Sequence, residues 1–333
     1  MMFINKELKN SLNSSKREIS KFPFWMYHVK SNFVYEKIST FDKTKRVSRA
    51  FYKMMEISRK FPEIQTINDK PIENVLCLCE APGGFIEALL FLNKNINIKA
   101  QSLKHCIEFS RKIDTSIYEY SDITKLETLL KITKFAKENC KYDLITADGG
   151  IDVSDDYSKQ EVKSVRILYS QIIIMLYNLK VGGNFIIKIF DCFHKETVQL
   201  LNILYNHFEN FEIIKPDLSR PCNSEKYVVC TNFKGYTETI KGFSSQLISG
   251  NNINPLDCMK FEKEIDTQFQ DKMTTFNNKF VSFQTKNIDC ILDICKSKMR
   301  SYAFSSRNFV KKDKSHYNQM KMSLSMFEFL KLN

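Results

Sequence analysis

Two apolar segments of the chain end on charged residues. Residues 142–147 are followed by Asp148, and residues 182–187 lead into Lys188. If both segments are strands of a parallel sheet, these side chains lie at the edge where such sheets bind ligands. A lysine and a carboxylate placed there can orient a substrate or move a proton. A salt bridge at a strand end is the alternative for either residue.

A glycine turn lies between an apolar run and a segment with helical spacing. Residues 74–79 are followed by Glu80-Ala81-Pro82-Gly83-Gly84-Phe85, which predicts a strand, a tight turn and a helix. Because glycine has no Cβ atom, such a turn can approach a ligand closely at the carboxyl end of a parallel strand. The spacing differs from G-x-G-x-x-G, so a dinucleotide is not the first choice of ligand. A turn that only starts a helix is the alternative.

The segments around these residues alternate between strand-like and helix-like patterns. This alternation predicts an α/β fold with a mainly parallel, seven-stranded sheet and helices on both faces. The last two strands are joined by a loop alone and can pair antiparallel. Strands are expected near residues 74–79, 96–103, 116–121, 142–148, 183–190, 210–216 and 226–233. Helices are expected near residues 85–94, 125–139, 158–180 and 195–208.

The composition favours an intracellular protein with a polyanionic partner. Lysine and arginine number 50 against 38 acidic residues, so the formal charge is +12, which suits RNA, DNA or an anionic membrane. The longest apolar run, 172–177, is far shorter than the roughly 20 residues of a membrane span, and residues 1–21 lack the apolar centre of a secretory signal. The ten cysteines form no C-x-x-C pair, so we expect a reducing compartment and no metal site.

We expect an N-terminal extension over residues 1–60 that is aromatic and basic. It contains Trp25, the only tryptophan, which can stack on a methylated guanine or anchor the N-terminal arm to the core. Residues 43–60 have the pattern of a basic amphipathic helix that carries Lys53. A solvated helix face is the other interpretation of its charges.

We expect residues 61–235 to form the core and residues 236–333 to form a basic helical extension. A connector rich in Gly, Ser and Asn spans residues 242–254. An apolar stripe at helical spacing follows, which can pack on the core or bind a partner. Its members are Ile288, Ile291, Leu292, Cys295 and Met299.

Four separated motifs resemble those of the FtsJ-like RNA ribose 2′-O-methyltransferases, over roughly residues 45–234. They are the glycine turn, the segments 142–150 and 182–191, and Ser219-Arg220-Pro221-Cys222-Asn223-Ser224-Glu225-Lys226-Tyr227, and they occur in the order of the family. The resemblance implies a Rossmann-like methyltransferase fold with S-adenosylmethionine as cofactor. The last motif and Asp191-Cys192-Phe193 are most similar to the branch that methylates the first transcribed nucleotide of capped mRNA.

The resemblance implies a catalytic tetrad that matches Lys53, Asp148, Lys188 and Glu225. The pattern Ser48-Arg49-Ala50-x-x-Lys53 is similar to the helix that carries the first lysine of the family. In this assignment Lys188 deprotonates the ribose 2′-hydroxyl, and Lys53 lowers the pKa of Lys188 and holds the ribose or phosphate. Asp148 and Glu225 orient the lysines and balance their charge.

The implied cofactor lies over the glycine turn and reaches the ends of the next two strands. The residues expected to bind it are Glu80, Ala81, Pro82, Gly83, Gly84, Phe85, Ser102, Leu103, Asp122 and Asp148. Asp122 matches the residue that contacts the adenine amino group, although an aspartate in this place is also a plain helix cap. The chain departs from many relatives at Cys77, where aspartate is common, and Glu80 can supply the missing carboxylate.

On the RNA side, the resemblance implies contacts from Arg49, Arg220 and Ser224, since an arginine fork suits phosphate oxygens. The expected reaction converts cap 0 to cap 1 on capped mRNA. The alternatives are the same chemistry on rRNA or tRNA, a catalytically silent RNA-binding scaffold, and an assembly factor that docks on a capping enzyme or an RNA polymerase. We expect no membrane partner, and the nucleus, the cytoplasm and, for a viral protein, the virion all fit as locations.

Overall fold

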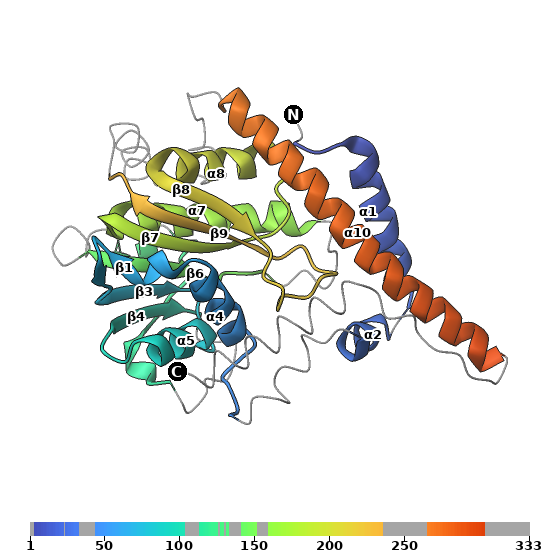
Figure 1. The fold of residues 1–333 in the computed structure, drawn as a ribbon, viewed down its shortest axis with the longest axis horizontal. Coiled ribbons are helices and arrows are strands. Elements are labelled where there is room, and N and C mark those ends of the chain that lie inside the picture. The colour runs from blue at the N-terminus through green and yellow to red at the C-terminus, as the bar shows by residue number, and fades with distance from the viewer. Residues whose placement is uncertain are drawn as a thin grey trace.

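The computed structural model describes residues 3–22, 24–32, 44–103, 113–125, 127–129, 131–132, 141–151, 159–235 and 265–303. Its centre is a seven-stranded sheet with the order β5-β4-β3-β6-β7-β9-β8 (Figure 1). The strands are β3 (Asn74–Leu78), β4 (Asn97–Ser102), β5 (Tyr118–Tyr120), β6 (Tyr142–Ala147), β7 (Leu179–Ile189), β8 (Phe208–Ile214) and β9 (Lys226–Phe233). A separate hairpin pairs β1 (Thr66–Ile67) with β2 (Lys70–Pro71).

The sheet is parallel except at β9, which runs antiparallel to both β7 and β8. β3 pairs in parallel with β4 and β6, and β6 pairs in parallel with β7. All six residues of β6 are buried, which is typical of a strand covered by helices on both faces. The predicted α/β fold is confirmed, including the antiparallel end of the sheet.

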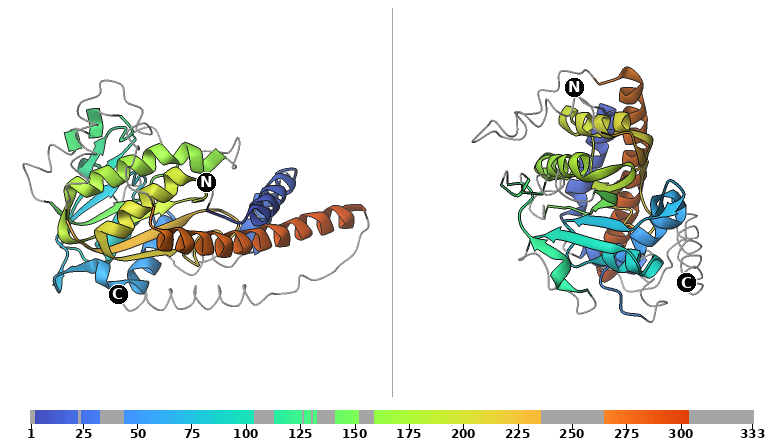
Figure 2. Two further views of the ribbon diagram at one scale, coloured as in Figure 1. Left: turned by 90° about the horizontal axis from the view of Figure 1, so that it is seen from above. Right: turned by 90° about the vertical axis from the view of Figure 1, so that its left-hand side faces the viewer.

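Helices cover both faces of the sheet (Figures 1 and 2). Val75 of β3 lies in one buried cluster with Phe51 and Phe85, whereas Ile145 of β6 lies in a second cluster with Leu201. The first cluster therefore joins the sheet to α4 and α5, and the second joins it to α7 and α8. The helices are α1 (Lys6–Ile19), α2 (Trp25–Asn32), α4 (Ala50–Lys60), α5 (Gly84–Leu92), α7 (Gln160–Asn178), α8 (Lys195–His207) and α10 (Thr267–Ala303), with short 3₁₀ turns η2 (Pro62–Gln65) and η3 (Thr115–Ile117).

The helix that carries Lys53 begins later than the sequence pattern predicts. α4 starts at Ala50, and residues 44–49 are not helical, although a helix was expected over residues 43–60. The backbone N–H of Val47 instead donates to Glu87 Oε2 (2.6 Å) on α5. Because this N–H serves a tertiary contact, the segment before Ala50 is tied to α5 and does not form a first helical turn.

Other predicted boundaries differ by a few residues. β7 begins at Leu179, ahead of the predicted start at residue 183, because Leu179 pairs with Tyr142 of β6. The predicted helix at 125–139 and the connector at 242–254 lie largely or wholly outside the described residues.

The two chain extensions pack against each other, and α1 lies beside α10 in Figures 1 and 2. Leu12 and Ile19 of α1 are buried in the same cluster as the stripe of α10, and Ser15 donates to Asp289 Oδ1 (2.6 Å). The buried members of the stripe are Ile288, Ile291, Leu292 and Cys295. The packing interpretation of the stripe is therefore confirmed for these four residues, and the side chain of Met299 lies outside the described part.

The seven cysteines within the described ranges are all free thiols. Among the helices of the same ranges, none combines the length and apolar character that a membrane span requires.

A close contact between α4 and α5 fixes Lys53 relative to the glycine turn. A Cβ atom at Gly84 would clash with Ser48 Oγ and would lie 2.7 Å from Ala50 Cβ. We therefore expect Gly84→Ala to lower the free energy of unfolding by about 1–3 kcal/mol, the usual cost of overpacking, in urea titrations followed by circular dichroism. Lys94→Ala, on the exposed loop after α5, is the control. An unchanged free energy in Gly84→Ala would mean that the two helices separate without cost.

Candidate active site

Four charged side chains from separate parts of the chain meet at the carboxyl edge of the sheet. Lys53 comes from α4, Asp148 follows β6, Lys188 lies near the end of β7, and Glu225 precedes β9. Because β9 runs antiparallel, its start lies at the same edge as the ends of the parallel strands. The structure thus brings the four predicted tetrad residues together, with only 12–15% of each side chain exposed.

Two ion pairs and a tyrosine connect the tetrad. Lys53 Nζ lies 2.8 Å from Glu225 Oε1, and Lys188 Nζ lies 3.2 Å from Asp148 Oδ1. Lys188 also donates to the Asp148 carbonyl oxygen (2.7 Å). The Tyr227 hydroxyl donates to Asp148 Oδ1 (2.8 Å) and accepts from Lys53 (3.3 Å). The contacts form one continuous chain from Glu225 to Lys188.

Tyr227 is a site residue to which the sequence alone assigned no role. Its ring is fully buried, with its centre 5.8 Å from that of Phe85. Burial, together with the carboxylates of Asp148 and Glu225, raises the pKa of Tyr227 well above its usual value, so the phenol keeps its proton. The sequence did contain a signal for this role. Tyr227 lies two residues after Glu225 at the start of a strand, where alternate side chains share a face.

The charges of the site keep Glu225 and Lys188 ionised. Burial alone would raise the pKa of Glu225, but the ammonium groups of Lys53 and Lys188 hold it well below its usual range. Burial alone would lower the pKa of Lys188, but the carboxylates of Asp148 and Glu225 raise it instead. The prediction that Lys188 has a lowered pKa is therefore wrong for this arrangement, because the two carboxylates outweigh burial.

A further lysine supports the segment that carries Glu225. Lys215 Nζ donates to the Asn223 carbonyl (2.9 Å), to Asn223 Oδ1 (2.7 Å) and to the Glu225 carbonyl (2.8 Å). Burial lowers the pKa of Lys215 to about 7. From the other side, the Ser219 hydroxyl donates to Glu225 Oε1 (2.7 Å). The position of Glu225 therefore depends on contacts to both its backbone and its carboxylate.

A cavity of about 540 Å³ lies between the glycine turn and the tetrad, and Lys188 forms part of its wall. Eight of the residues predicted to bind the cofactor line it: Glu80, Ala81, Pro82, Gly84, Ser102, Leu103, Asp122 and Asp148. The other two support the turn, since Gly83 adopts a left-handed φ of +105° and the Phe85 ring is fully buried. Lining residues that the sequence did not single out are Cys79, Gln101, Ile123, Thr124, Gly150, Ile151 and Ile167.

The hydrogen bonding of the Glu80 carboxylate indicates whether S-adenosylmethionine suits this cavity. Glu80 Oε1 accepts from the Phe85 N–H (2.7 Å), but Oε2 is buried and has no hydrogen-bond partner in the described part of the chain. Burial and the nearby Asp148 raise the pKa of Glu80 well above its usual value. A buried carboxylate oxygen without a donor suits an incoming ammonium group, and the methionine part of the cofactor carries one. The residues present therefore fit the cofactor.

Asp122 lies at the wall of this cavity, and its carboxylate also caps a turn. Its Oδ1 accepts from the backbone N–H (2.9 Å) and the hydroxyl (2.7 Å) of Thr124. The turn-capping contact holds the carboxylate at the cavity wall.

The three predicted RNA contacts lie in different surroundings. Arg220 and Ser224 line a second, smaller cavity. Ser224 is buried and donates to Gln160 Oε1 (2.7 Å). Arg49 donates to the Leu218 carbonyl (2.8 Å) and so holds the loop before Arg220.

The chain is similar to several known proteins. The cap-specific mRNA (nucleoside-2′-O-)-methyltransferase of Autographa californica nuclear polyhedrosis virus is 27% identical over 300 residues, which cover 87% of this chain and 99% of the viral protein. The cap-specific mRNA (nucleoside-2′-O-)-methyltransferase 1 of Dictyostelium discoideum is 31% identical over 226 residues, which cover 57% of this chain and 30% of that protein. A solved structure of a putative ribosomal RNA methyltransferase from Plasmodium falciparum is 22% identical, with a TM-score of 0.44, and the match covers 57% of this chain and 99% of that one.

The family match covers the sheet and all four tetrad residues. Residues 46–233, more than half of the chain, match the FtsJ-like methyltransferase family. Together with the seven-stranded sheet and the cavity at its carboxyl edge, this match shows that the chain belongs to the FtsJ-like methyltransferases.

Proposed function

We propose that this protein transfers a methyl group from S-adenosylmethionine to the ribose 2′-hydroxyl of the first transcribed nucleotide of capped mRNA, which converts cap 0 to cap 1. The observation that carries the proposal is the connected tetrad at the wall of the cavity that fits the cofactor. FtsJ-like methyltransferases generally use this cofactor. The names of the viral and Dictyostelium relatives support the mRNA cap as the substrate.

Methyl transfer to a hydroxyl requires alignment of the reacting atoms and a route for the proton. When bound, the cofactor supplies a methyl group made electrophilic by the adjacent sulfonium. In the proposed reaction Lys188 Nζ, at the junction of the tetrad and the cavity, accepts the proton of the 2′-hydroxyl. Asp148 orients Lys188 through its carboxylate and its carbonyl oxygen.

The second ion pair holds the substrate side of the site. Lys53 is fixed by Glu225 and by the Tyr227 hydroxyl, so we propose that its ammonium group holds the ribose or a phosphate oxygen.

Lys188 must be neutral to accept a proton, and its raised pKa makes the neutral fraction small near pH 7. The reaction is therefore expected to speed up as the pH rises.

The substrate is tested with labelled S-adenosylmethionine and three short RNAs of one sequence, which carry an m7G cap, an unmethylated G cap or a 5′-triphosphate. Each RNA is used with and without a 2′-O-methyl group on its first nucleotide. We expect transfer to capped RNA that disappears when the first ribose is blocked. Transfer that ignores the cap or survives the block would move the substrate to rRNA, tRNA or other internal sites. Cofactor binding without any transfer would favour the scaffold alternative.

Lys188 is tested through the pH dependence of single-turnover methyl transfer between about pH 6.5 and 9. The parent rate should increase with pH, because deprotonation produces the neutral amine. Lys188→Ala should lose about 10²–10⁴-fold in rate together with this increase. Lys234→Ala, at the opposite end of β9 from Glu225, is the control and should keep both. A parent rate that does not change with pH would rule out Lys188 as the proton acceptor.

Tyr227→Phe removes only the hydroxyl that joins Lys53 to Asp148. Loss of a hydrogen bond to a charged group costs about 1.5–3 kcal/mol, so we expect the methyl-transfer rate to fall about 10- to 100-fold. The Kd of the cofactor, measured by calorimetry, should not change, because Tyr227 is outside the lining of the cofactor cavity. Tyr205→Phe, whose ring packs on Phe211 in the core, is the matched control. A Tyr227→Phe rate equal to that of the parent would show that the two ion pairs act independently.

A further inference from the structure

The second cavity, of about 260 Å³, adjoins the tetrad. Phe190, two residues after Lys188, and Ser224, directly before Glu225, both line it. Lys188 Nζ lies 5.9 Å from the centre of the Phe190 ring. A chemical group inside this cavity can therefore belong to the same RNA 5′ end as a ribose held at Lys188.

The remaining walls come mainly from the two chain extensions. Helices α1, α2 and α10 lie outside residues 46–233, so the FtsJ-like part of the chain does not build this cavity alone. We call it the extension chamber. The extension residues that line it are Lys16, Ile19, Ser20, Trp25, Met26, Val29, Gln284 and Ile288.

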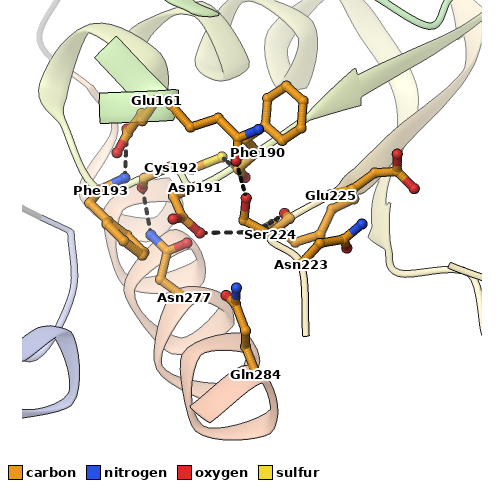
Figure 3. A network of polar contacts seen from close by, with 12 residues as sticks. Glu161, Phe190, Asp191, Cys192, Phe193, Asn223, Ser224, Glu225, Asn277 and Gln284 are labelled. Atoms are coloured by element: carbon orange, nitrogen blue, oxygen red, sulfur yellow. Dashed lines mark hydrogen bonds and ion pairs between the residues drawn. The ribbon is translucent and has the colours of Figure 1, made fainter. Parts of the chain in front are cut away.

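Buried amide side chains of α10 donate hydrogen bonds to both loops of the active site, and Figure 3 shows the contact of Asn277 with Cys192. Asn277 donates to the carbonyl oxygens of Phe3 (2.7 Å) and Cys192 (2.6 Å), and Gln284 donates to that of Cys222 (3.0 Å). Both amides are buried. Since Cys192 follows β7 and Cys222 precedes β9, one helix fixes the two loops that border the tetrad.

A buried carboxylate ties the N-terminal extension to the same place. Asp191 Oδ2 lies 3.2 Å from Lys16 Nζ on α1, and Asp191 Oδ1 lies 3.7 Å from Lys226 Nζ at the start of β9. Burial would raise the pKa of Asp191, but Lys16 and Lys226 lower it, so the carboxylate is ionised. The chamber is thus a defined part of the fold, held by paired and hydrogen-bonded groups.

The lining of the chamber suits a planar heteroaromatic group. Trp25 and Ile288 offer apolar faces, whereas Arg220 and Asn223 offer hydrogen-bonding groups. An apolar cavity of about 150 Å³ holds benzene, so the extension chamber has room for a larger ring system. Aromatic side chains and arginine planes stack on unpaired bases, whereas a phosphate group placed among the apolar residues would lose its hydration.

We infer that the extension chamber binds one nucleobase of the RNA 5′ end and thereby places the ribose of the first transcribed nucleotide at Lys188. The inference rests on the proposed function, because it takes RNA as the substrate. Two bases share the required chemistry: the guanine of the cap and the base of the first transcribed nucleotide.

Trp25 provides a direct test, because it is the only tryptophan of the chain. The full chain, with S-adenosylhomocysteine added to fill the cofactor cavity, is titrated with m7GpppA, ATP or inorganic tripolyphosphate while tryptophan fluorescence is recorded. We expect saturable quenching by a nucleotide and none by tripolyphosphate. Quenching by m7GpppA alone assigns the chamber to the cap guanine, and equal quenching by ATP assigns it to the first transcribed base. Quenching by neither nucleotide, or equally by tripolyphosphate, contradicts the inference.

Trp25→Ala tests the energetic contribution of stacking. Since stacking of one base is worth about 1–3 kcal/mol, we expect the Kd for m7GpppA, or for ATP if that is the ligand, to rise about 10- to 100-fold by calorimetry. Tyr27→Ala, an aromatic residue on the same helix with 64% of its surface exposed, is the matched control and should bind as the parent does. Equal affinity of Trp25→Ala and the parent would refute the chamber assignment.

The two proposals fail in different ways. Cap-dependent methyl transfer with no fluorescence response and unchanged affinity of Trp25→Ala would refute the chamber and leave the proposed reaction standing. Nucleotide-induced quenching and a weakened Trp25→Ala in a protein that transfers no methyl group would refute the proposed reaction and leave the chamber standing.

Discussion

The site depends on placing two ammonium groups and two carboxylates at one sheet edge in matched pairs. Removing one partner from a buried ion pair costs roughly 3–5 kcal/mol. Lys53 with Glu225 and Lys188 with Asp148 avoid this cost. Tyr227 then joins the pairs, because its hydroxyl touches both Lys53 and Asp148. Neither pair can shift far without breaking a buried hydrogen bond of the other.

This requirement explains why the reversed direction of β9 matters. A parallel strand in its place would put Glu225 at the opposite edge of the sheet, away from the ends of β6 and β7. With β9 antiparallel, Tyr227 lies opposite Lys188 in the sheet register. The segment before β9 is then held by Lys215 and Ser219, and the extensions reach it through Gln284. The extensions thereby support the loops that border the tetrad, as well as lining a cavity beside them.

Local patterns predicted those features that do not depend on distant contacts. The strands follow from apolar runs bounded by glycine and polar residues, whereas the tetrad was assigned from the resemblance of its motifs to those of the FtsJ-like family. The start of α4 could not be predicted, because it depends on Glu87 accepting the Val47 N–H. Whether the pKa of Lys188 is raised or lowered depends on whether carboxylates or a second lysine dominate its surroundings. Only the folded structure shows which of them does. The extension chamber requires contacts such as that of Asn277 with Phe3, 274 positions apart in the chain.

Glu80 shows how the site accommodates a departure from the expected pattern. Cys77 stands where the resemblance leads to an aspartate, and burial raises the pKa of its thiol, so it carries no charge. Glu80, three positions later, carries a carboxylate that the Phe85 N–H holds at the wall of the cavity beside the glycine turn. Burial and the nearby carboxylate of Asp148 raise the pKa of Glu80, although the ammonium groups of Lys188 and Lys53 act in the opposite direction. A ligand that carries positive charge, as the proposed cofactor does on its ammonium and sulfonium groups, would favour the ionised form of Glu80, whose Oε2 has no hydrogen-bond partner in the described part of the chain.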